Sequence, residues 1–563
     1  MAGKIDVIVV GLGASGGIIA AELAKAGAKV IALDKGPAYS DEDFVLKHDE
    51  IRYYARGAMV PGMETDPITW RPDSVSEAKI LPWASGPLGL SDPLHLPPSL
   101  GVGGGTNHWG GAAWRFRAAE FRMRSAIIER FGEKALPEHT NIVDWPITYD
   151  DLEPYYDRTE WQLGISGKAG NINGELMEGG NPFESPRKRD FPMPPLRHGP
   201  ADFAFADACR KLGFSPFRQA AAIASVDFKG RSACVYCGFC HGFPCHVGAK
   251  TSTQVAVLPE GIASGNLEIR PYSRVYRVNR DESGDRVIGV SYIDADGQAQ
   301  DLEGRIVILA CYALENVRLM LLSGINRNGQ TGKYFMTHSY GFYEGLTKEW
   351  SNPFMSPLTA SSVIADHTGE LIPDNDLGVL WGSSITSWPG ETQPIEATHL
   401  VPPGVATWGQ EFKNWMRENF RRLYGMYHQT SNFPDERYYC DLDPNVKDPW
   451  SQPALRITHD WTAHDIASVE FHLRIKRQIG KEMGIVESWE EAAAPPFHLS
   501  THETGIHRMG DDPSSSVVDI YGHSHECSQL YVVGGGQFPT YGGYNPTQTI
   551  MAMAFMTADH IMK

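Results

Sequence analysis

The chain has 563 residues, enough for about two to four ordinary domains or for one large α/β core with insertions. Its 50 basic and 68 acidic side chains give a net charge of −18, which argues against a nucleic-acid binder and against docking to an anionic membrane. Hydrophobic residues make up 42% and charged residues 21%, a balance typical of a folded globular protein. We see no apolar run of roughly 18 residues, so no segment is expected to span a membrane. The chain enters a strand pattern at Asp6 without the pattern of an export signal, so we expect none.

The first forty residues follow a strand–helix–strand pattern. Residues 6–10 continue after Asp6 as an unbroken apolar run, as in a strand buried on both faces of a parallel sheet, and residues 29–33 form a second such run after Lys29. Residues 18–26 between them carry apolar side chains at helical spacing. This pattern predicts a doubly wound, Rossmann-like α/β fold. Further strands are expected at residues 267–270, 275–278, 287–292, 305–310 and 530–533, with a final helix at 547–560.

The turn after the first strand fits the dinucleotide-binding pattern G-x-G-x-x-G with Gly11, Gly13 and Gly16. The first glycine allows a tight turn, the second lets a pyrophosphate approach the backbone, and the third lets the helix pack on the strand. Asp34 closes the second strand, where a carboxylate can accept the ribose hydroxyls. An acid here disfavours a 2′-phosphate, so FAD or NAD is favoured over NADP.

Two long stretches show little periodicity. Residues 36–98 are rich in Pro, Asp and Gly, and such an excursion is expected to be a lid or a cofactor cover. Residues 340–500 are rich in Trp and Pro and are predicted to be irregular. The resulting domain prediction is a discontinuous cofactor-binding domain (1–45, 95–120, 246–335 and 510–563), a substrate domain (121–233 and 336–509) and a separate cysteine segment (234–245).

A second glycine cluster extends from residue 101 to 112 and includes Gly103, Gly104 and His108. Its composition suits a chain that passes close to a flat or charged ligand. A simple NAD dehydrogenase needs nothing comparable, so this cluster favours a flavin.

These segments together resemble the glucose–methanol–choline (GMC) family of flavin oxidoreductases. Within the family the chain is most similar to the bacterial sugar and sugar-acid dehydrogenases, a group that includes gluconate 2-dehydrogenase, FAD glucose dehydrogenase, fructose dehydrogenase and glucoside 3-dehydrogenase. The resemblance implies bound FAD and a Rossmann-like FAD-binding domain interleaved with a mixed α+β substrate domain. The sequence departs from the family pattern at Cys311-Tyr312, where Ala-Gly is usual. It also departs at Gly534-Gly535-Gly536, where an acid-Ala-Ser run is common. The matching segments are residues 11–34, 101–112, 308–324 and 502–563.

His108 lies in Thr106-Asn-His-Trp, which is similar to the segment that carries a flavin-linked histidine in pyranose-oxidase-like members. Two alternatives stay open: a covalent bond to the flavin, or a hydrogen bond near it.

Four cysteines fall within twelve residues, at Cys234, Cys237, Cys240 and Cys245. Their spacing, C-x₂-C-x₂-C-x₄-C, is close to the bacterial ferredoxin run that wraps one iron–sulfur cluster. Structural zinc and redox-active thiols are the alternatives, although Cys₄ zinc sites usually use two separated knuckles. Resembling dehydrogenases include members with a three-iron cluster held by three cysteines in this region. A 3Fe-4S cluster is therefore favoured over 4Fe-4S, and Cys237 is the weakest ligand candidate.

The predicted catalytic pair is His502 and Asn545, whose segments His502-Glu-Thr-Gly-Ile and Asn545-Pro546 resemble the family's two C-terminal motifs, His-x-x-Gly-Thr and Asn/His-Pro. A neutral imidazole can take the hydroxyl proton of an alcohol while the carbinol hydrogen leaves as hydride to flavin N5. Asn545 can hold the same oxygen, and it is also a candidate for contact with the cofactor. His507 is the alternative base, and a purely structural histidine or a helix cap at Asn545 are the plainer interpretations.

The resemblance implies an FAD-dependent sugar dehydrogenase, with glucoside 3-dehydrogenase as the favoured activity and a gluconate 2-dehydrogenase-like enzyme as its rival. A pyranose-oxidase-like enzyme that uses oxygen, and a non-catalytic electron-transfer subunit, are the other interpretations. Resembling enzymes pair with a small subunit that carries the export signal and with a haem subunit or cytochrome c. We therefore expect periplasmic location through a partner, with a cytoplasmic enzyme as the alternative.

Overall fold

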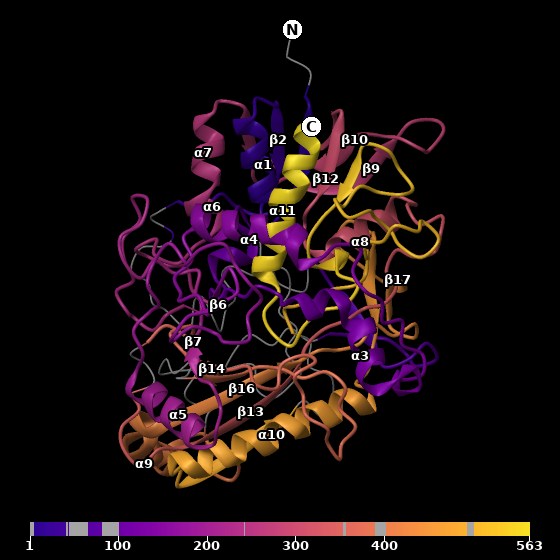
Figure 1. Ribbon diagram of the computed structural model, residues 1–563. Helices are drawn as coiled ribbons and strands as arrows, with labels where there is room; N and C mark the ends of the chain where they lie inside the picture. The colour runs from indigo at the N-terminus through magenta and orange to yellow at the C-terminus, as the bar shows by residue number, and fades with distance from the viewer. Residues whose placement is uncertain are drawn as a thin grey trace.

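The cofactor end of the molecule is built on a five-stranded parallel sheet in the order β20-β12-β1-β2-β8 (Figure 1). Its strands are Leu530–Val532, Ile306–Leu309, Val7–Val10, Val30–Leu33 and Leu267–Arg270. All residues of β1 and β2 are buried, as their unbroken apolar sequence predicts. The Rossmann-like prediction is thereby confirmed.

The computed structural model describes residues 5–40, 43, 66–81, 101–240, 242–352, 356–388, 401–492 and 500–563.

Helices cover this sheet with small and aliphatic side chains. Helix α1 (Gly16–Lys25) packs against α11 (Thr547–Met562) and α7 (Leu258–Ala263), and Figure 1 shows the three helices together near both termini. The predicted helices at 18–26 and 547–560 are therefore confirmed. The predicted strands at 275–278 and 287–292 are confirmed as β9 (Arg274–Arg280) and β10 (Val287–Ile293). These two strands form a small antiparallel sheet with β11 (Ala299–Glu303).

The opposite end of the molecule is a six-stranded antiparallel sheet in the order β19-β13-β16-β15-β14-β7. Its strands are Glu487–Ala492, Ser339–Leu346, Leu423–Thr430, Ile385–Trp388, Ser362–Ile364 and Phe217–Arg218. Helix α10 (Ala463–Met483) runs along its outer face (Figure 1). The prediction that residues 340–500 are irregular is therefore wrong. The pairing of β13 with β16 joins segments about eighty residues apart, which local patterns do not reveal.

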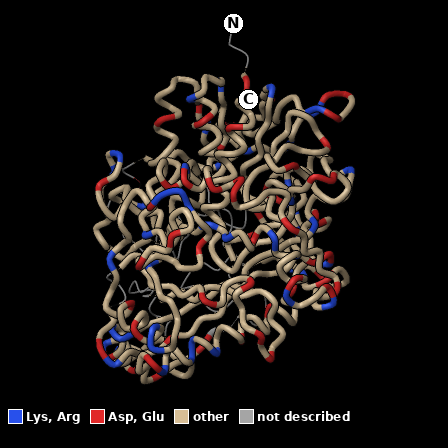
Figure 2. Tube along the Cα trace, viewed as in Figure 1, with Lys and Arg blue, Asp and Glu red and all other residues tan. Residues whose placement is uncertain are grey.

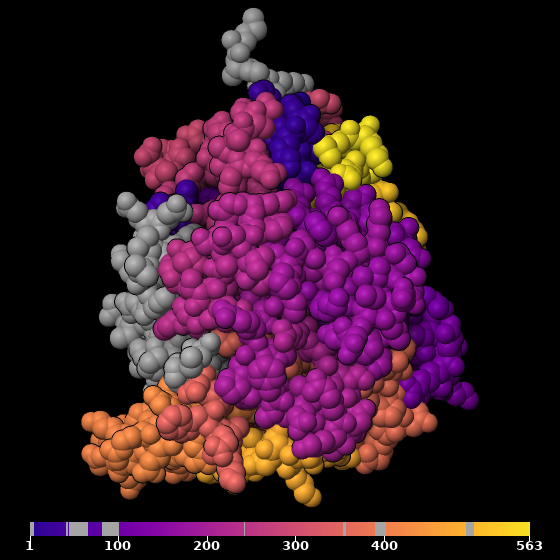
Figure 3. Space-filling view, turned by 60° about the vertical axis from the view of Figure 1, so that its left-hand side comes forward, coloured from indigo at the N-terminus to yellow at the C-terminus, as the bar shows by residue number. Residues whose placement is uncertain are grey.

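The remaining elements form two smaller sheets and further helices. Strands β3 (Ile68–Arg71), β4 (Lys79–Ile80), β17 (Tyr439–Lys447) and β18 (Pro453–Thr458) form a four-stranded sheet, and β5 (Asn171–Ile172) pairs with β6 (Glu175–Leu176). The remaining helices are α3 (Met123–Phe131), α4 (Tyr149–Leu163), α5 (Pro200–Lys211), α6 (Thr253–Ala256), α8 (Ala313–Leu322) and α9 (Gly409–Asn419). Figure 3 shows the purple-to-magenta part of the chain covering the face between the indigo end and the orange end.

Charged residues of both signs are interspersed along the trace in Figure 2. No helix within the described ranges is both long and apolar enough to cross a membrane. The strands of the parallel sheet fall inside the ranges assigned to the cofactor-binding domain, and those of the six-stranded sheet fall inside the substrate domain. The boundaries themselves stay a prediction. Most of the expected cover over residues 36–98 lies outside the described residues.

Candidate active site

The three glycines of the first turn have different surroundings. Gly11 has a positive φ of 89°, and a methyl group on Gly16 would lie 2.0 Å from the Gly11 carbonyl oxygen, so both positions need glycine for the turn itself. A methyl group on Gly13 would meet nothing within 4 Å. Gly13 therefore faces open space at the N-terminus of α1, where backbone N–H groups favour an anion.

The other glycine segments lie against this turn. A methyl group on Gly104 would lie 2.9 Å from the Gly13 Cα, and one on Gly534 would lie 3.7 Å from Ser15 Oγ. The neighbouring Gly103 has a φ of 99° and packs on the Asn107 side chain. The structure therefore brings together glycines that are more than 500 residues apart in the sequence.

Two buried polar atoms in these segments have no hydrogen-bond partner among the described residues. They are the Asn107 Oδ1 and the Gln537 Nε2. Gly535 is buried beside them in a short 3₁₀ turn (535–537). Open space at Gly13, glycine walls and orphaned polar groups together fit a dinucleotide with a flat ring system, as FAD has.

Asp34 ends β2 and is buried beneath the glycine turn. Its Oδ2 accepts a hydrogen bond from the Leu12 N–H at 3.2 Å, and its Oδ1 accepts one from the Gly36 N–H at 3.0 Å. Burial raises the pKa of Asp34, and these backbone N–H groups oppose that rise. The carboxylate ties the turn to the end of the strand. Its contact with a ribose remains a prediction.

His108 follows the 3₁₀ turn Gly104–Asn107 and connects the glycine cluster to the cysteine segment. The Gly242 N–H donates a hydrogen bond to the His108 carbonyl oxygen at 2.8 Å, and Lys250 Nζ donates one to the Trp109 carbonyl oxygen at 2.8 Å. The segment that would cover a flavin therefore touches the cysteine loop directly. A covalent bond from His108 to the flavin and a hydrogen bond near it both stay predictions.

Three of the four predicted metal-ligand cysteines meet at one small apolar cluster, and Cys237 is not part of it. Cys240 is buried in it, and Cys234 and Cys245 pack on its edge. Backbone N–H groups of Tyr236 and Lys250 reach the sulfurs of Cys234 and Cys245, at 3.3 and 3.4 Å. Burial raises the pKa of the Cys234 thiol to about 11 and also raises those of Cys237 and Cys240. Within the described residues no group of three or more His, Cys, Asp or Glu side chains is placed to hold a metal ion.

His502 and Asn545 come together in space although 43 residues separate them in the sequence. The Asn545 Nδ2 lies 3.4 Å from the His502 Nε2. Asn545 lies directly before Pro546 at the start of α11, and the His502 N–H is held by Ser500 Oγ at 3.0 Å. The two predicted catalytic residues thus face each other, and their chemical roles remain a proposal.

The alternative base, His507, lies in a different environment. It is fully buried, and a methyl group on Gly536 would come within 2.2 Å of its ring. Its Nε2 lies 3.5 Å from the Asn316 Nδ2. Burial lowers the pKa of His507 to about 3, so this imidazole resists taking a proton. This environment favours His502 as the base.

Several residues beside the pair were not found by sequence reasoning. His338 Nδ1 lies 2.9 Å from His502 Nδ1, and Gln429 Nε2 donates a hydrogen bond to Asn545 Oδ1 at 2.9 Å. Tyr340 places its hydroxyl 3.5 Å from His502 Nδ1. Glu503 is buried, and its carboxyl group accepts a hydrogen bond from the Tyr312 hydroxyl. Burial raises the pKa of Glu503 to about 8. No local motif marks His338, Tyr340 or Gln429, because they reach the site through the pairing of β13 with β16. Glu503 directly follows His502 in the sequence.

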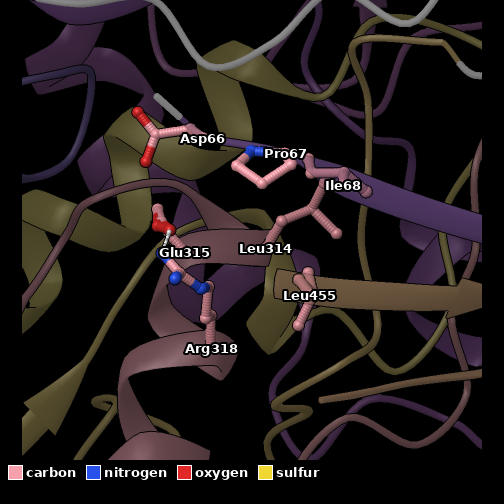
Figure 4. A pocket seen from close by; sticks show the side chains of 7 residues that line it. All are labelled: Asp66, Pro67, Ile68, Leu314, Glu315, Arg318 and Leu455. Atoms are coloured by element: carbon pink, nitrogen blue, oxygen red, sulfur yellow. Dashed lines mark hydrogen bonds and ion pairs between the residues drawn. The ribbon is translucent and has the colours of Figure 1, made fainter. Parts of the chain in front are cut away.

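A small separate pocket lies between α8, β18 and the start of β3 (Figure 4). Arg318 donates hydrogen bonds to Glu315 Oε1 at 3.2 Å and to Asp448 Oδ2 at 2.8 Å. Burial acts to raise the pKa of Asp66, but Lys35 and Arg274 outweigh it and hold that pKa at about 2. The pocket contains none of the predicted site residues and its charges are paired, so we assign it a structural role. It is lined by Asp66, Pro67, Ile68, Leu314, Glu315, Arg318 and Leu455.

Comparison with known proteins identifies the family. Two models described as GMC oxidoreductase match residues 143–340 and 434–554. The gluconate 2-dehydrogenase flavoprotein of Pantoea cypripedii is 30% identical over 99% of this chain and 93% of its own length. The fructose dehydrogenase large subunit of Gluconobacter japonicus is 25% identical over 99% of this chain and 97% of its own.

A crystal structure of pyridoxine 4-oxidase from Mesorbium loti superimposes with a TM-score of 0.63 at 16% identity, covering 99% of both chains, and it shares the fold. The family models match more than half of the chain, and the first relative matches nearly all of it. The chain therefore belongs to the GMC oxidoreductase family and is an FAD-dependent oxidoreductase that acts on CH–OH groups.

Proposed function

We propose that the protein is a dehydrogenase that oxidises a secondary or anomeric hydroxyl of a sugar or glycoside, with His502 as the base and Asn545 as its partner. The observation that carries this proposal is the 3.4 Å approach of the Asn545 amide to the His502 Nε2. Two groups that can share one substrate oxygen converge there from distant parts of the chain.

Oxidation of an alcohol removes the hydroxyl proton and transfers the carbinol hydrogen with its electron pair. Bound FAD supplies the hydride acceptor. His502 Nε2 takes the hydroxyl proton, and a positioned base of this kind contributes roughly 10²–10⁴-fold to the rate. The Asn545 Nδ2 donates a hydrogen bond to the same oxygen and stabilises the negative charge that develops on it.

An aromatic wall leads away from this pair and suits a sugar ring. Tyr340 and Phe342 point to the same face of β13, because side chains two apart share a face of a strand. Phe342 pairs across the sheet with Tyr427, and Trp388 lies 4.9 Å from Phe342 between ring centroids. Gly341 and Tyr343 face the other way, toward α10. The aromatic wall therefore starts at His502, 3.5 Å from the Tyr340 hydroxyl.

Aromatic faces bind the C–H side of a neutral pyranose, so this wall favours a glucoside, with oxidation at the 3-position as our first candidate. The second candidate is a gluconate 2-dehydrogenase activity, which the 30% identity to the Pantoea flavoprotein supports. A panel of glucosides, free sugars and sugar acids, added under nitrogen, tests both. Bleaching of the flavin by glucosides supports the first candidate, and bleaching by gluconate alone supports the second.

The aromatic wall has a direct test in Trp388→Ala. This change should raise the KM for a glucoside and leave the KM for a small alcohol unchanged. Equal KM values for wild type and variant would mean that the substrate binds elsewhere.

Oxygen consumption at a rate that matches sugar oxidation would contradict a dehydrogenase and favour an oxidase.

We further propose that electrons leave through an iron–sulfur cluster, 3Fe-4S or 4Fe-4S, held by Cys234, Cys240 and Cys245, with Cys237 as a fourth candidate. This rests on the spacing of the thiols and on the hydrogen bond from Gly242 to the His108 carbonyl, which joins the cysteine loop to the flavin-side segment. The two electrons of each turnover would pass singly to an acceptor such as a cytochrome. Analysis for iron and acid-labile sulfide tests the cluster, and stoichiometric zinc would contradict it.

We also propose that the protein acts in the periplasm. A small subunit with an export signal and a haem subunit would carry the protein to the periplasm and receive its electrons. Fractionation of the host, with co-purification of the native complex, is the test. Activity confined to the cytoplasm would contradict the periplasmic location.

A further inference from the structure

Two buried residues on neighbouring strands hold the proposed catalytic pair. His338 directly precedes β13, and Gln429 lies in β16, where it pairs with Tyr340. His338 Nδ1 lies 2.9 Å from His502 Nδ1, and Gln429 Nε2 lies 2.9 Å from Asn545 Oδ1. Each member of the pair therefore has one partner from the end of the β13–β16 pairing where β13 begins.

The hydrogen bonds of His338 determine where its own proton lies. Its Nε2 is 3.0 Å from the Gly542 carbonyl oxygen, which can only accept, so Nε2 carries the proton. Burial, together with the nearby His502, lowers the pKa of His338 well below its ordinary value, so this imidazole stays neutral. A neutral ring protonated at Nε2 has a lone pair at Nδ1.

That lone pair determines the tautomer of His502. Two Nδ1 lone pairs would repel each other at 2.9 Å, so the proton between the rings belongs to His502. The neutral His502 ring then carries its own lone pair at Nε2, the atom that faces the Asn545 amide 3.4 Å away. This is the tautomer that a base needs at that position.

Gln429 fixes the amide orientation of Asn545. Its Nε2 donates to Asn545 Oδ1, which turns the Asn545 Nδ2 toward His502. With the opposite amide orientation two donors would face each other at 2.9 Å, and an oxygen would face the His502 lone pair. Only one orientation satisfies both contacts.

We propose that His338 and Gln429 are positioning residues that fix the proton of His502 on Nδ1 and the amide orientation of Asn545, so that a lone pair and a donor both meet the substrate hydroxyl. This inference rests on the proposed roles of the pair. When the substrate O–H bond breaks, its proton goes to His502 Nε2 and the carbinol hydrogen leaves as hydride to FAD. The resulting imidazolium donates more strongly to His338 Nδ1, which stabilises the charge.

A pair of amide variants at position 338 separates positioning from packing. In His338→Asn the side-chain oxygen can occupy the place of Nδ1 and accept from His502. In His338→Gln the longer amide reaches toward the Gly542 carbonyl instead. We expect the Gln variant to reduce flavin with a maximal rate ~10- to 100-fold lower at nearly unchanged KM, and the Asn variant to recover most of the rate. Equal rates in the two variants would overturn the inference.

Two further variants provide controls. His338→Phe keeps the stacking on Tyr541, whose ring centroid is 4.2 Å away, and should be as slow as the Gln variant. His428→Leu changes a buried histidine of β16 whose ring nitrogens have no hydrogen-bond partner among the described residues, and it should keep the wild-type rate. A wild-type rate in His338→Phe would show that the acceptor is not needed.

Gln429→Leu tests the second contact. Loss of the donor to Asn545 Oδ1 should lower the maximal rate of flavin reduction, with the flavin content unchanged. Gln429→Leu with wild-type kinetics would contradict the role of this residue. If His502→Ala itself reduces flavin at the normal rate, the proposed function has failed. If His502→Ala is inactive while the variants at 338 and 429 behave as wild type, only this inference has failed.

Discussion

A single methyl group at Gly13 should weaken FAD binding without weakening the fold. Apart from the residue's own neighbours along the chain, no described atom lies within 4 Å of the place where the methyl carbon would sit, and the backbone there is outside the left-handed region. Gly13→Ala should therefore leave the apoprotein unchanged or stabilise it by about 0.4–1 kcal/mol through the unfolded state. The methyl group occupies space that the phosphates need, and loss of one charge-assisted hydrogen bond costs about 1.5–3 kcal/mol. FAD affinity should fall roughly 10- to 100-fold.

The assay pairs FAD titration of the apoprotein with its urea unfolding. Gly16→Ala is the matched control, because its methyl group would lie 2.0 Å from the Gly11 carbonyl oxygen and should destabilise the apoprotein itself. Wild-type FAD affinity in Gly13→Ala would refute the assignment of the phosphate site. A large loss of apoprotein stability would refute the claim that this position is open.

Two further predictions concern the electron route and pH. Cys240→Ser should leave flavin reduction by sugar intact but slow electron transfer to cytochrome c; equal transfer rates in both proteins would remove Cys240 from the route. Burial raises the pKa of Glu503 from 4.5 to about 8, so the folded protein keeps a proton that the unfolded chain loses. That contribution to stability is full below about pH 4.5 and is lost as pH rises toward 8. Glu503→Gln should therefore reduce the slope of the free energy of unfolding against pH in this range, as measured by urea unfolding. An unchanged slope would mean that Glu503 ionises normally.

The cofactor end could be predicted from the sequence because its signals are local. An apolar strand, a glycine turn and a helix follow one another within 25 residues, so β1, α1 and β2 needed no knowledge of distant contacts. The final helix was equally clear, since α11 is apolar on nearly every face and begins just after Asn545-Pro546.

The substrate end was missed for two different reasons. Helix α10 does have local signals: a capping box in which Thr462 and Asp465 bond each other's backbone, and Gly484 with a φ of 73° at its end. These signals were obscured by the surrounding Trp- and Pro-rich sequence. The six-stranded sheet has no such signal, because β13 pairs with β16 and β19 from far along the chain.

The candidate site also combines residues that the sequence marks with residues that it does not. His502 and Asn545 could be named from their motifs, and the structure brings their side chains to 3.4 Å. His338 and Gln429 could not be named, because a histidine before a strand and a glutamine within one carry no pattern. Their positions depend on the register of β13 against β16.

The central claim is that His502 is the base for alcohol oxidation, and anaerobic stopped-flow reduction of the flavin in His502→Ala tests it most directly. The account predicts full flavin content and a rate of flavin reduction by sugar roughly 10²–10⁴-fold lower than wild type. The matched variant His507→Ala should affect that rate far less, since His507 contacts Asn316 and not Asn545. Near-normal flavin reduction in His502→Ala would contradict the account.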